Sequence, residues 1–428
     1  MPSIYTLTLT TLVSLSTAYS LPPNLHSRQA LSDLKTGSWL LTWTPSMPNP
    51  QTYKGPLRIT SNSSSLYISA DLYNGTTNPD PADGSPILSR ENYWAFVRPT
   101  KLSSTSNGGF DLGLEFYKYK GTPNPFNHYT DWESEPWEGG LSASLSASTA
   151  PAGFPSDTSY FSGNVTFAGN GSAAGTLSMG WVSDYVRRYT VEIGGVAGLE
   201  RPLADASGTR TWKSIFADAL IDMSLESGVD VPDQPNGIWD TAQAHAAMLQ
   251  YRRPTNFDRV WRIYLLMVKK DRDVARGAMM DGKRDSNDPV PREAAVIANE
   301  WLIGTNADGS PDTQHAWPAS VVGKPFVSLH DAWFRTAVHE VGHFFNLGHP
   351  AEFQNGLMDD TQTYVDAGEQ GLTSKKFPEN IDARALAFTG WERHFMAHRP
   401  DTHVRPGWID FGAAAQDETP PVVLDLLA

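Results

Sequence analysis

The spacing of apolar residues changes about halfway along this chain, and this change restricts its possible folds more than any other feature. Between residues 37 and 195 apolar side chains recur at every second position, and one clear run contains Leu66, Ile68, Ala70 and Leu72. A period of two is typical of β-strands that bury one face. After Thr211 the spacing becomes helical, with an apolar stripe formed by Trp212, Ile215, Phe216, Leu220 and Met223. The pattern predicts an α+β chain in which an antiparallel β domain, either a sandwich or a barrel, precedes a half that contains helices.

The length and charge of the chain limit its domain count and its partners. A chain of 428 residues is too long for one ordinary core, so two domains are expected. Hydrophobic residues make up 40% and charged residues 19%, which is typical of a folded globular protein. The net charge of −14 argues against nucleic acid and against an anionic membrane surface as partners.

The first twenty residues have the pattern of an export signal. The apolar run from Ile4 to Leu15 is too short to span a membrane, and Ala18-Tyr19-Ser20 offers small residues at the spacing of a cleavage site. We therefore predict a signal peptide at residues 1–20, a leader or linker at 21–36, and a secreted protein. No later segment contains 18 consecutive apolar residues, so no membrane anchor is expected.

Four N-glycosylation sequons support secretion of the protein. They all lie between residues 62 and 172, and their acceptors are Asn62, Asn74, Asn164 and Asn170. This clustering predicts that the β-rich ancillary domain at 37–195 is exposed and carries glycans. The join to the second half is expected between Gly194 and Gly208, and residues 411–428 are expected to form a loosely attached tail.

A cluster of histidines in the second half has the spacing of a zinc site. His339 and His343 are four residues apart, about one helical turn, so their imidazoles leave the same face of a helix. His349 follows as a third ligand, which leaves one position of a tetrahedral Zn²⁺ open for water. Glu340 stands beside the first ligand, where it can take a proton from that water as the catalytic base. The helix is expected to begin near Ser328, with Asp331 in a capping box.

The string from His339 to His349 resembles the zinc signature HExxHxxGxxH of the metzincin metalloendopeptidases. Asn346 stands where the family has glycine, and asparagine is among the residues that tolerate the left-handed backbone such a turn needs. Met358, in the segment Asn355-Gly356-Leu357-Met358-Asp359-Asp360, resembles the methionine turn of the matrixin branch. The resemblance implies that Met358 packs under the imidazoles. It also implies that 205–410 is a metzincin-like catalytic domain with a twisted mixed sheet and an active-site helix. Tyr364 is a candidate for the tyrosine that touches the metal in some branches.

The resemblance predicts a zinc-dependent endopeptidase whose partner is a protein or peptide substrate, which could be a glycoprotein. Ca²⁺ is a weaker cofactor prediction, because oxygen-rich loops at 80–83, 281–288 and 306–309 could bind it. The β domain is open to two interpretations, a binding or folding module and a propeptide-like clamp released at Arg187-Arg188.

Two other functions compete with the peptidase. One is a secreted carbohydrate- or surface-binding protein with a degenerate or structural zinc domain, in which Trp132 and Trp137 stack on sugars or else belong to the core. The other is a zinc hydrolase that acts on something other than peptides. An intact Glu340 argues against a degenerate site, because a purely structural metal needs no base.

Overall fold

The computed structural model describes residues 34–46, 51–62, 65–75, 79–105, 108–120, 133, 136–284 and 288–412. The predicted signal peptide at 1–20, most of the leader and of the tail, and Trp132 lie outside these ranges. Within them, no helix combines the length and the apolar character that a membrane crossing requires.

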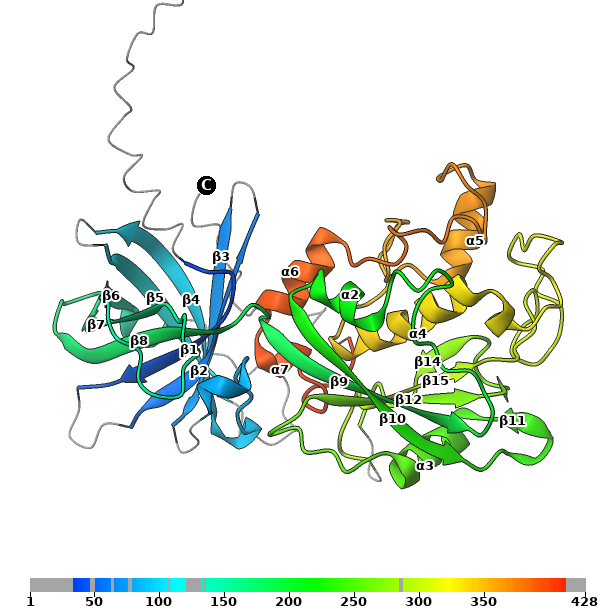
Figure 1. Cartoon of the computed structure of the whole chain (residues 1–428), viewed down its shortest axis with the longest axis horizontal. Helices are drawn as coiled ribbons and strands as arrows, with labels where there is room; N and C mark the ends of the chain where they lie inside the picture. The colour runs from blue at the N-terminus through cyan, green and yellow to red at the C-terminus, as the bar shows by residue number, and fades with distance from the viewer. Residues whose placement is uncertain are drawn as a thin grey trace, which may run out of the picture.

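The first half of the chain forms a closed barrel of eight antiparallel strands (Figure 1). Each strand pairs with the next, and the last pairs back with the first, as with Leu41 opposite Met179. One face of each strand fills the interior, which an eight-stranded barrel leaves just wide enough for side chains. The strands are β1 (Gly37–Thr44), β2 (Tyr53–Ser61), β3 (Leu66–Asn74), β4 (Tyr93–Ser104), β5 (Phe110–Lys118), β6 (Leu141–Ala147), β7 (Tyr160–Phe167) and β8 (Ala173–Ser183).

The second half is built on a five-stranded sheet with the order β10-β9-β12-β15-β14. Four strands are parallel, and the edge strand β14 runs antiparallel to β15. The sheet strands are β9 (Arg187–Val196), β10 (Ile221–Val231), β12 (Arg262–Val268), β14 (Gly277–Met279) and β15 (Ala294–Ala298). The short strands β11 (Ile238–Trp239) and β13 (Lys270–Asp271) form a separate pair. Strand β12 is buried along its whole length except for Arg262.

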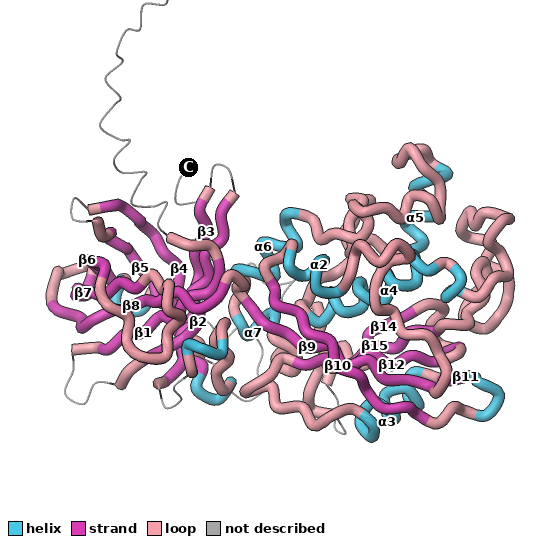
Figure 2. The backbone as a smooth tube through the Cα atoms, viewed as in Figure 1, coloured by secondary structure: helices cyan, strands magenta, loops and turns pink. Residues whose placement is uncertain are grey.

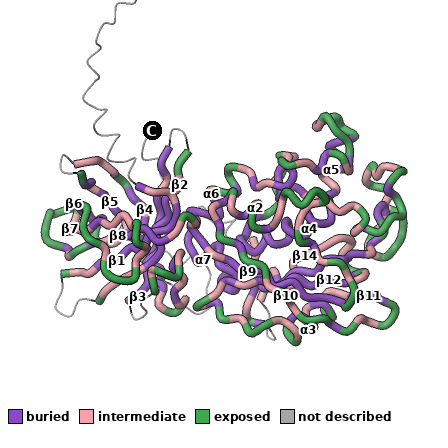
Figure 3. The backbone as a smooth tube through the Cα atoms, viewed as in Figure 1, coloured by how far each residue is buried: buried purple, intermediate pink, exposed green. Residues whose placement is uncertain are grey.

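All α-helices of the described ranges belong to the second half (Figure 2). Helix α4 crosses one face of the sheet and α3 lies on the opposite face (Figure 1). The helices are α2 (Trp212–Ala217), α3 (Thr241–Tyr251), α4 (His330–Phe344), α5 (Thr361–Glu369), α6 (Gly390–His398) and α7 (Asp401–Val404). Short 3₁₀ turns occur at Pro81–Asp83, Arg90–Asn92, Trp137–Gly139, Pro235–Gly237 and Phe326–Ser328. Figure 3 shows that burial follows the barrel wall and the central strands of the sheet.

The predicted fold class was wrong. We expected an α+β chain in which an N-terminal antiparallel β domain is followed by a metzincin-like catalytic domain. Strands instead dominate the described chain, which contains a closed eight-stranded barrel, and its longest α-helix, α4, has 15 residues. The spacing of the histidines specifies that three imidazoles can point toward one metal ion. It does not specify the fold around them, so the step from signature to domain architecture failed.

Two local predictions also differ from the structure. The apolar stripe after Thr211 continues beyond the end of helix α2 at Ala217, and Met223 lies in strand β10. Strand β9 lies in the segment assigned to the β domain, yet it pairs with β10 and β12 in the second sheet. The chain therefore passes from barrel to sheet between Ser183 and Arg187, before the expected join.

Buried charges connect the barrel to the C-terminal helices. Arg58 of β2 lies 2.6 Å from Asp71 of β3 and 3.1 Å from Asp401, the first residue of α7. Arg187 also pairs with Asp401 and donates to the carbonyl oxygen of Met396. Burial alone would raise the pKa of Asp401, but Arg187 and Arg58 outweigh it and hold that pKa below its usual range. Arg187 is buried in this cluster, which argues against the alternative in which the chain is processed at Arg187-Arg188.

Candidate metal centre

Helix α4 is a rigid, buried support for two of the three histidines. It begins at His330 and not at Ser328, and its N-cap residue, Leu329, makes no side-chain capping bond. Asp331 instead accepts a hydrogen bond from the backbone of Ala206 at 2.7 Å. Trp333 donates its indole N–H to Asn299, which follows β15, at 3.1 Å and so fixes the helix to the sheet.

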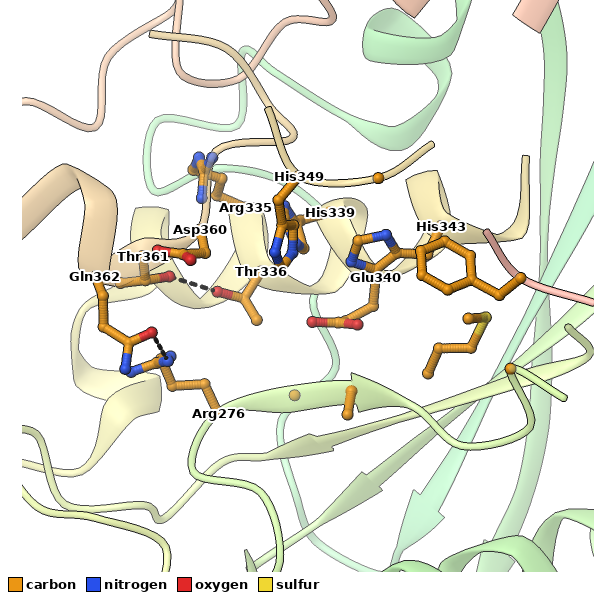
Figure 4. A pocket seen from close by; sticks show the side chains of 16 residues that line it. Arg276, Arg335, Thr336, His339, Glu340, His343, His349, Asp360, Thr361 and Gln362 are labelled. Atoms are coloured by element: carbon orange, nitrogen blue, oxygen red, sulfur yellow. Dashed lines mark hydrogen bonds between the residues drawn. The ribbon is translucent and has the colours of Figure 1, made fainter. Parts of the chain in front are cut away.

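The three histidines converge on one point, as Figure 4 shows. His339 and His343 leave the same face of α4, and His349 returns to them after the helix ends. The ring centroids of the three pairs are 4.7, 4.9 and 4.9 Å apart, and the Nε2 atoms of His339 and His349 are 2.9 Å apart. One nitrogen from each ring lies within 4.8 Å of the others. The sequence therefore predicted the grouping of these side chains correctly.

Asn346 makes the return of His349 possible. Its φ is 68°, in the left-handed region that asparagine tolerates. Its side chain also holds the C-terminal segment: Nδ2 donates to the carbonyl oxygen of His403 at 3.2 Å, and Oδ1 accepts from the N–H of Gly412 at 2.7 Å. Glycine could supply the backbone turn but neither hydrogen bond.

Backbone carbonyls fix the orientation of two imidazoles. Nδ1 of His339 lies 2.8 Å from the carbonyl oxygen of Leu357, and Nδ1 of His343 lies 2.7 Å from that of Leu347. A carbonyl can only accept, so Nδ1 carries the proton and Nε2 is left with its lone pair directed at the cluster. This is the tautomer that a metal ligand requires.

Burial keeps these imidazoles neutral. It lowers the pKa of His339 well below its usual value, lowers that of His343 to about 4, and lowers that of His349. Zinc binds imidazole nitrogen at about 2.0–2.1 Å, so two tetrahedral ligands stand ~3.3 Å apart. The 2.9 Å between the Nε2 atoms of His339 and His349 needs only a small outward movement to reach this spacing. The donor set therefore fits Zn²⁺.

Glu340 lies in the cleft between the histidines and strand β14 (Figure 4). The cleft has a volume of about 440 Å³ and is lined on one side by β14. Burial raises the pKa of Glu340 to about 8, against the effects of Arg276 and of a hydrogen bond from the N–H of Met279. Gly277 leaves room for this carboxylate, because a Cβ there would lie 3.2 Å from Cγ of Glu340.

Met358 is buried against helix α4. A Cβ added to Gly342 would lie 2.3 Å from its sulfur, so the methionine packs on the turn of helix that separates His339 from His343. Tyr364 does not replace a metal-touching tyrosine, since its hydroxyl donates to the carbonyl oxygen of Gly356 at 3.0 Å.

Arg335 is a supporting residue that no sequence pattern marked. Its guanidinium is buried and donates to the carbonyl oxygens of Ala385, Gly356, Leu357 and Asp359. Because Leu357 also accepts from His339, this arginine fixes the carbonyl that orients a ligand. Arg276, Gln362 and Phe411 also line the cleft, and no sequence pattern marked them.

The predicted Ca²⁺ loops contribute one acidic cluster. Asp281, Asp288 and Glu293 are buried with carboxylate oxygens within 4.8 Å of one another. Each already has partners: Asp281 accepts from two backbone N–H groups, Asp288 lies 2.8 Å from His245, and Glu293 pairs with Arg252. Among the described residues, the loops at 80–83 and 306–309 form no such cluster. Calcium binding stays a prediction.

The four sequon asparagines lie on or near the barrel surface. Asn62, Asn164 and Asn170 are exposed, and Asn74 is partly exposed. Their positions are compatible with glycans, and glycosylation stays a prediction.

Comparisons with known proteins identify no family. No family model matches the chain, and no curated protein does. Among solved structures, a conserved protein of unknown function with a hot dog fold from Alicyclobacillus acidocaldarius is similar at 10% identity, over 36% of this chain and 81% of that one. Its TM-score of 0.12 is too low to support a conclusion about fold or function.

Proposed function

We propose that this chain is a secreted zinc-dependent endopeptidase in which His339, His343 and His349 hold the metal. The observation that carries the proposal is the convergence of three neutral imidazoles beside a buried carboxylate, in a cleft of about 440 Å³. The signature of these residues resembles that of the metzincin endopeptidases. The exposed sequon asparagines and the pattern at residues 1–20 support secretion.

An exposed strand edge favours a peptide as substrate. Strand β14 lines the cleft, and among the described strands it pairs only with β15, so its other edge faces the cleft, where the N–H of Met279 donates to Glu340. An extended peptide can add to such an edge through main-chain hydrogen bonds. This pairing would lay a peptide bond across the histidine cluster, which favours a peptide over a compact substrate.

Glu340 is the proposed general base. A zinc ion at the three histidines would polarise the scissile carbonyl and lower the pKa of a bound water. The Glu340 carboxylate accepts a proton from the attacking water and delivers it to the leaving amine. Burial raises the pKa of Glu340 to about 8, and the charge of a zinc ion at the histidines would act together with the N–H of Met279 and the charge of Arg276 to favour the ionised carboxylate that this role requires.

Zinc content and casein cleavage of the full chain test the proposal, with wild type compared against Glu340→Gln. We expect one zinc per chain in both proteins and a loss of activity of about 10²- to 10⁴-fold in the variant. Glu352→Gln, which changes an exposed carboxylate nearby, is the matched control and should retain full activity. Full activity of Glu340→Gln would refute the assignment of the base, and absence of zinc would refute the metal site.

A second function, carbohydrate binding by the barrel, is favoured by an aromatic cavity at one end of it. The cavity has a volume of about 160 Å³, and its lining includes Trp43, Tyr53, Trp94 and Trp137. Trp137 is partly exposed, and its ring lies 5.7 Å from that of Trp94. Quenching of tryptophan fluorescence by an oligosaccharide, lost in Trp137→Ala, would establish this activity. No described barrel residue lines the zinc cleft, which argues against the propeptide-like clamp.

A further inference from the structure

The two ends of the cleft differ in chemistry. At one end, Phe411 packs against the ring of His343 with centroids 5.1 Å apart, next to Met279 and Gly282. At the other end, beyond His349, polar side chains line the cleft (Figure 4). These are Arg276, Asp360, Thr361 and Gln362. A substrate that crosses the metal site would meet an apolar wall on one side and a polar wall on the other.

Arg276 is the unusual member of the polar end. It directly precedes β14, is partly exposed, and lies over the ring of Trp301 at 5.3 Å. Its guanidinium donates to Oε1 of Gln362 at 2.6 Å and forms no ion pair with any described carboxylate. A guanidinium has five N–H donors, and the bond to Gln362 uses one of those that Arg276 brings to the cleft.

Three carboxylates attract the charge of Arg276 without forming an ion pair with it, namely those of Asp360, Glu340 and Asp312. Arg335 gives its donors to backbone carbonyls. Asp360 caps helix α5 by accepting from the N–H of Thr363 at 2.6 Å, and Asp312 accepts from the indole of Trp317 at 2.7 Å. Burial lowers the pKa of Arg276, which shows that its charge is poorly solvated. A partly desolvated cation in an open cleft is stabilised by an anion that arrives from outside.

We infer that Arg276 binds a carboxylate of the substrate, so that this enzyme prefers to cut close to an acidic group. A carboxylate pairs with a guanidinium through two parallel hydrogen bonds, a geometry that an amide or a hydroxyl cannot provide. Gln362 holds the guanidinium by its oxygen, and its amide nitrogen remains as a further donor to the same anion. The carboxylate is either an Asp or Glu side chain or the C-terminus of the peptide. The inference rests on the proposed peptidase function.

The test begins with a cleavage site mapped by mass spectrometry in unfolded casein. Matched peptides around that site carry Glu or Gln beside the scissile bond, each with an amidated or a free C-terminus. We expect wild type to have at least a 10-fold higher kcat/KM for the peptide with the carboxylate, and Arg276→Gln to lose this preference. Arg276→Lys should keep a smaller preference, since a point charge lacks the paired donors. Arg272→Gln, at an exposed arginine paired with Asp240, is the control and should behave as wild type.

The same peptides are also bound to the zinc-loaded Glu340→Gln variant, with and without Arg276→Gln, and followed by fluorescence anisotropy. These affinities give the preference for a carboxylate in the absence of cleavage. Comparison of the amidated and free C-termini shows whether the side-chain or the C-terminal carboxylate is recognised. Equal cleavage of the Glu and Gln peptides by wild type, or a preference that survives Arg276→Gln, would overturn the role of Arg276 and leave the peptidase function standing. If zinc-loaded wild type cleaves no peptide bond in casein, the proposed function itself fails.

Discussion

The backbone N–H of Gly412 donates to Oδ1 of Asn346 at 2.7 Å, which ties the C-terminal segment to the turn between the second and third histidines. The one position at which the zinc signature departs from its pattern is therefore also the position that anchors the end of the described chain. The departure from glycine has a structural explanation, because the asparagine side chain joins two segments that glycine would leave apart.

Substitution of Asn346 should separate its backbone role from its side-chain role. Asn346→Gly keeps the left-handed turn but leaves the partners at His403 and Gly412 unsatisfied, at a cost of about 1–3 kcal/mol. Asn346→Ala loses the same bonds and adds the strain of a positive φ, about 1 kcal/mol more. We expect the free energy of unfolding in urea to be highest for wild type, lower for Asn346→Gly and lowest for Asn346→Ala. A glycine variant as stable as wild type would contradict the anchoring role.

Gly342→Ala should disturb the packing of Met358. Overpacking of this kind lowers the free energy of unfolding by about 1–3 kcal/mol, and the higher helix propensity of alanine raises it by about 1 kcal/mol. We therefore expect a net loss of about 1 kcal/mol in thermal unfolding. Zinc affinity, measured by competition with a chelator, should also fall, since Leu357 beside Met358 orients His339. Gly348→Ala is the control, because a Cβ there meets nothing within 4 Å.

Asp401→Asn should strongly destabilise the chain. The amide cannot balance the buried charges of Arg58 and Arg187, and removal of one partner from a buried ion pair costs about 3–5 kcal/mol. Asp230→Asn is the surface control. Asp230 pairs with Arg201 but its side chain is 70% exposed, so we expect a change below about 0.5 kcal/mol. Similar urea denaturation midpoints for the two variants would contradict the importance of the junction.

The buried imidazole of His398 predicts a loss of stability in mild acid. Burial lowers its pKa well below the usual value, and His394, Arg58 and Arg187 lower it further. Above pH ~6.5 the ring is neutral in both states. As the pH falls below that value, the unfolded chain binds a proton that the folded chain does not, so the free energy of unfolding decreases by up to about 1.4 kcal/mol per pH unit.

His398→Gln tests this dependence. The glutamine amide can keep bonds to Thr60 and Ser69, which the imidazole now contacts at 2.7 and 3.0 Å. Between pH 6.5 and 5 we expect wild type to lose about 2 kcal/mol more than the variant in urea unfolding. Parallel curves for wild type and His398→Gln would contradict the prediction.

The sequence predicted the residues of the candidate site better than it predicted the fold. The spacing of His339, His343 and His349 determines where their side chains point once a helix forms, and the structure brings these rings together. Strand β9 shows the opposite case. The alternation of Tyr189, Val191 and Ile193 is typical of a strand with one solvent-exposed face. Glu192, on the other face, is nevertheless buried and accepts a hydrogen bond from the backbone N–H of Arg253. A paired polar residue inside the protein gives the same sequence pattern as an exposed one.

The residues of the cleft wall could not be predicted from the sequence, for a different reason. Arg276 and Phe411 are brought to one cleft from positions far apart in the chain by the path of the backbone, and neither lies in a local pattern. The direct sequence signal at the site was restricted to residues that a single helix and its following turn hold together.

The bond between Arg58 and Asp401 joins residues 343 positions apart, and it has a consequence for how this protein is made. A growing chain emerges from the ribosome with its barrel sequence first, but Asp401, which neutralises Arg58, is translated 343 residues later. Contacts at such separation also slow folding, since a large loop must close before they form. Phe411 follows Asp401 in the chain, so its side of the histidine cleft is also added only after the barrel and the sheet have been translated.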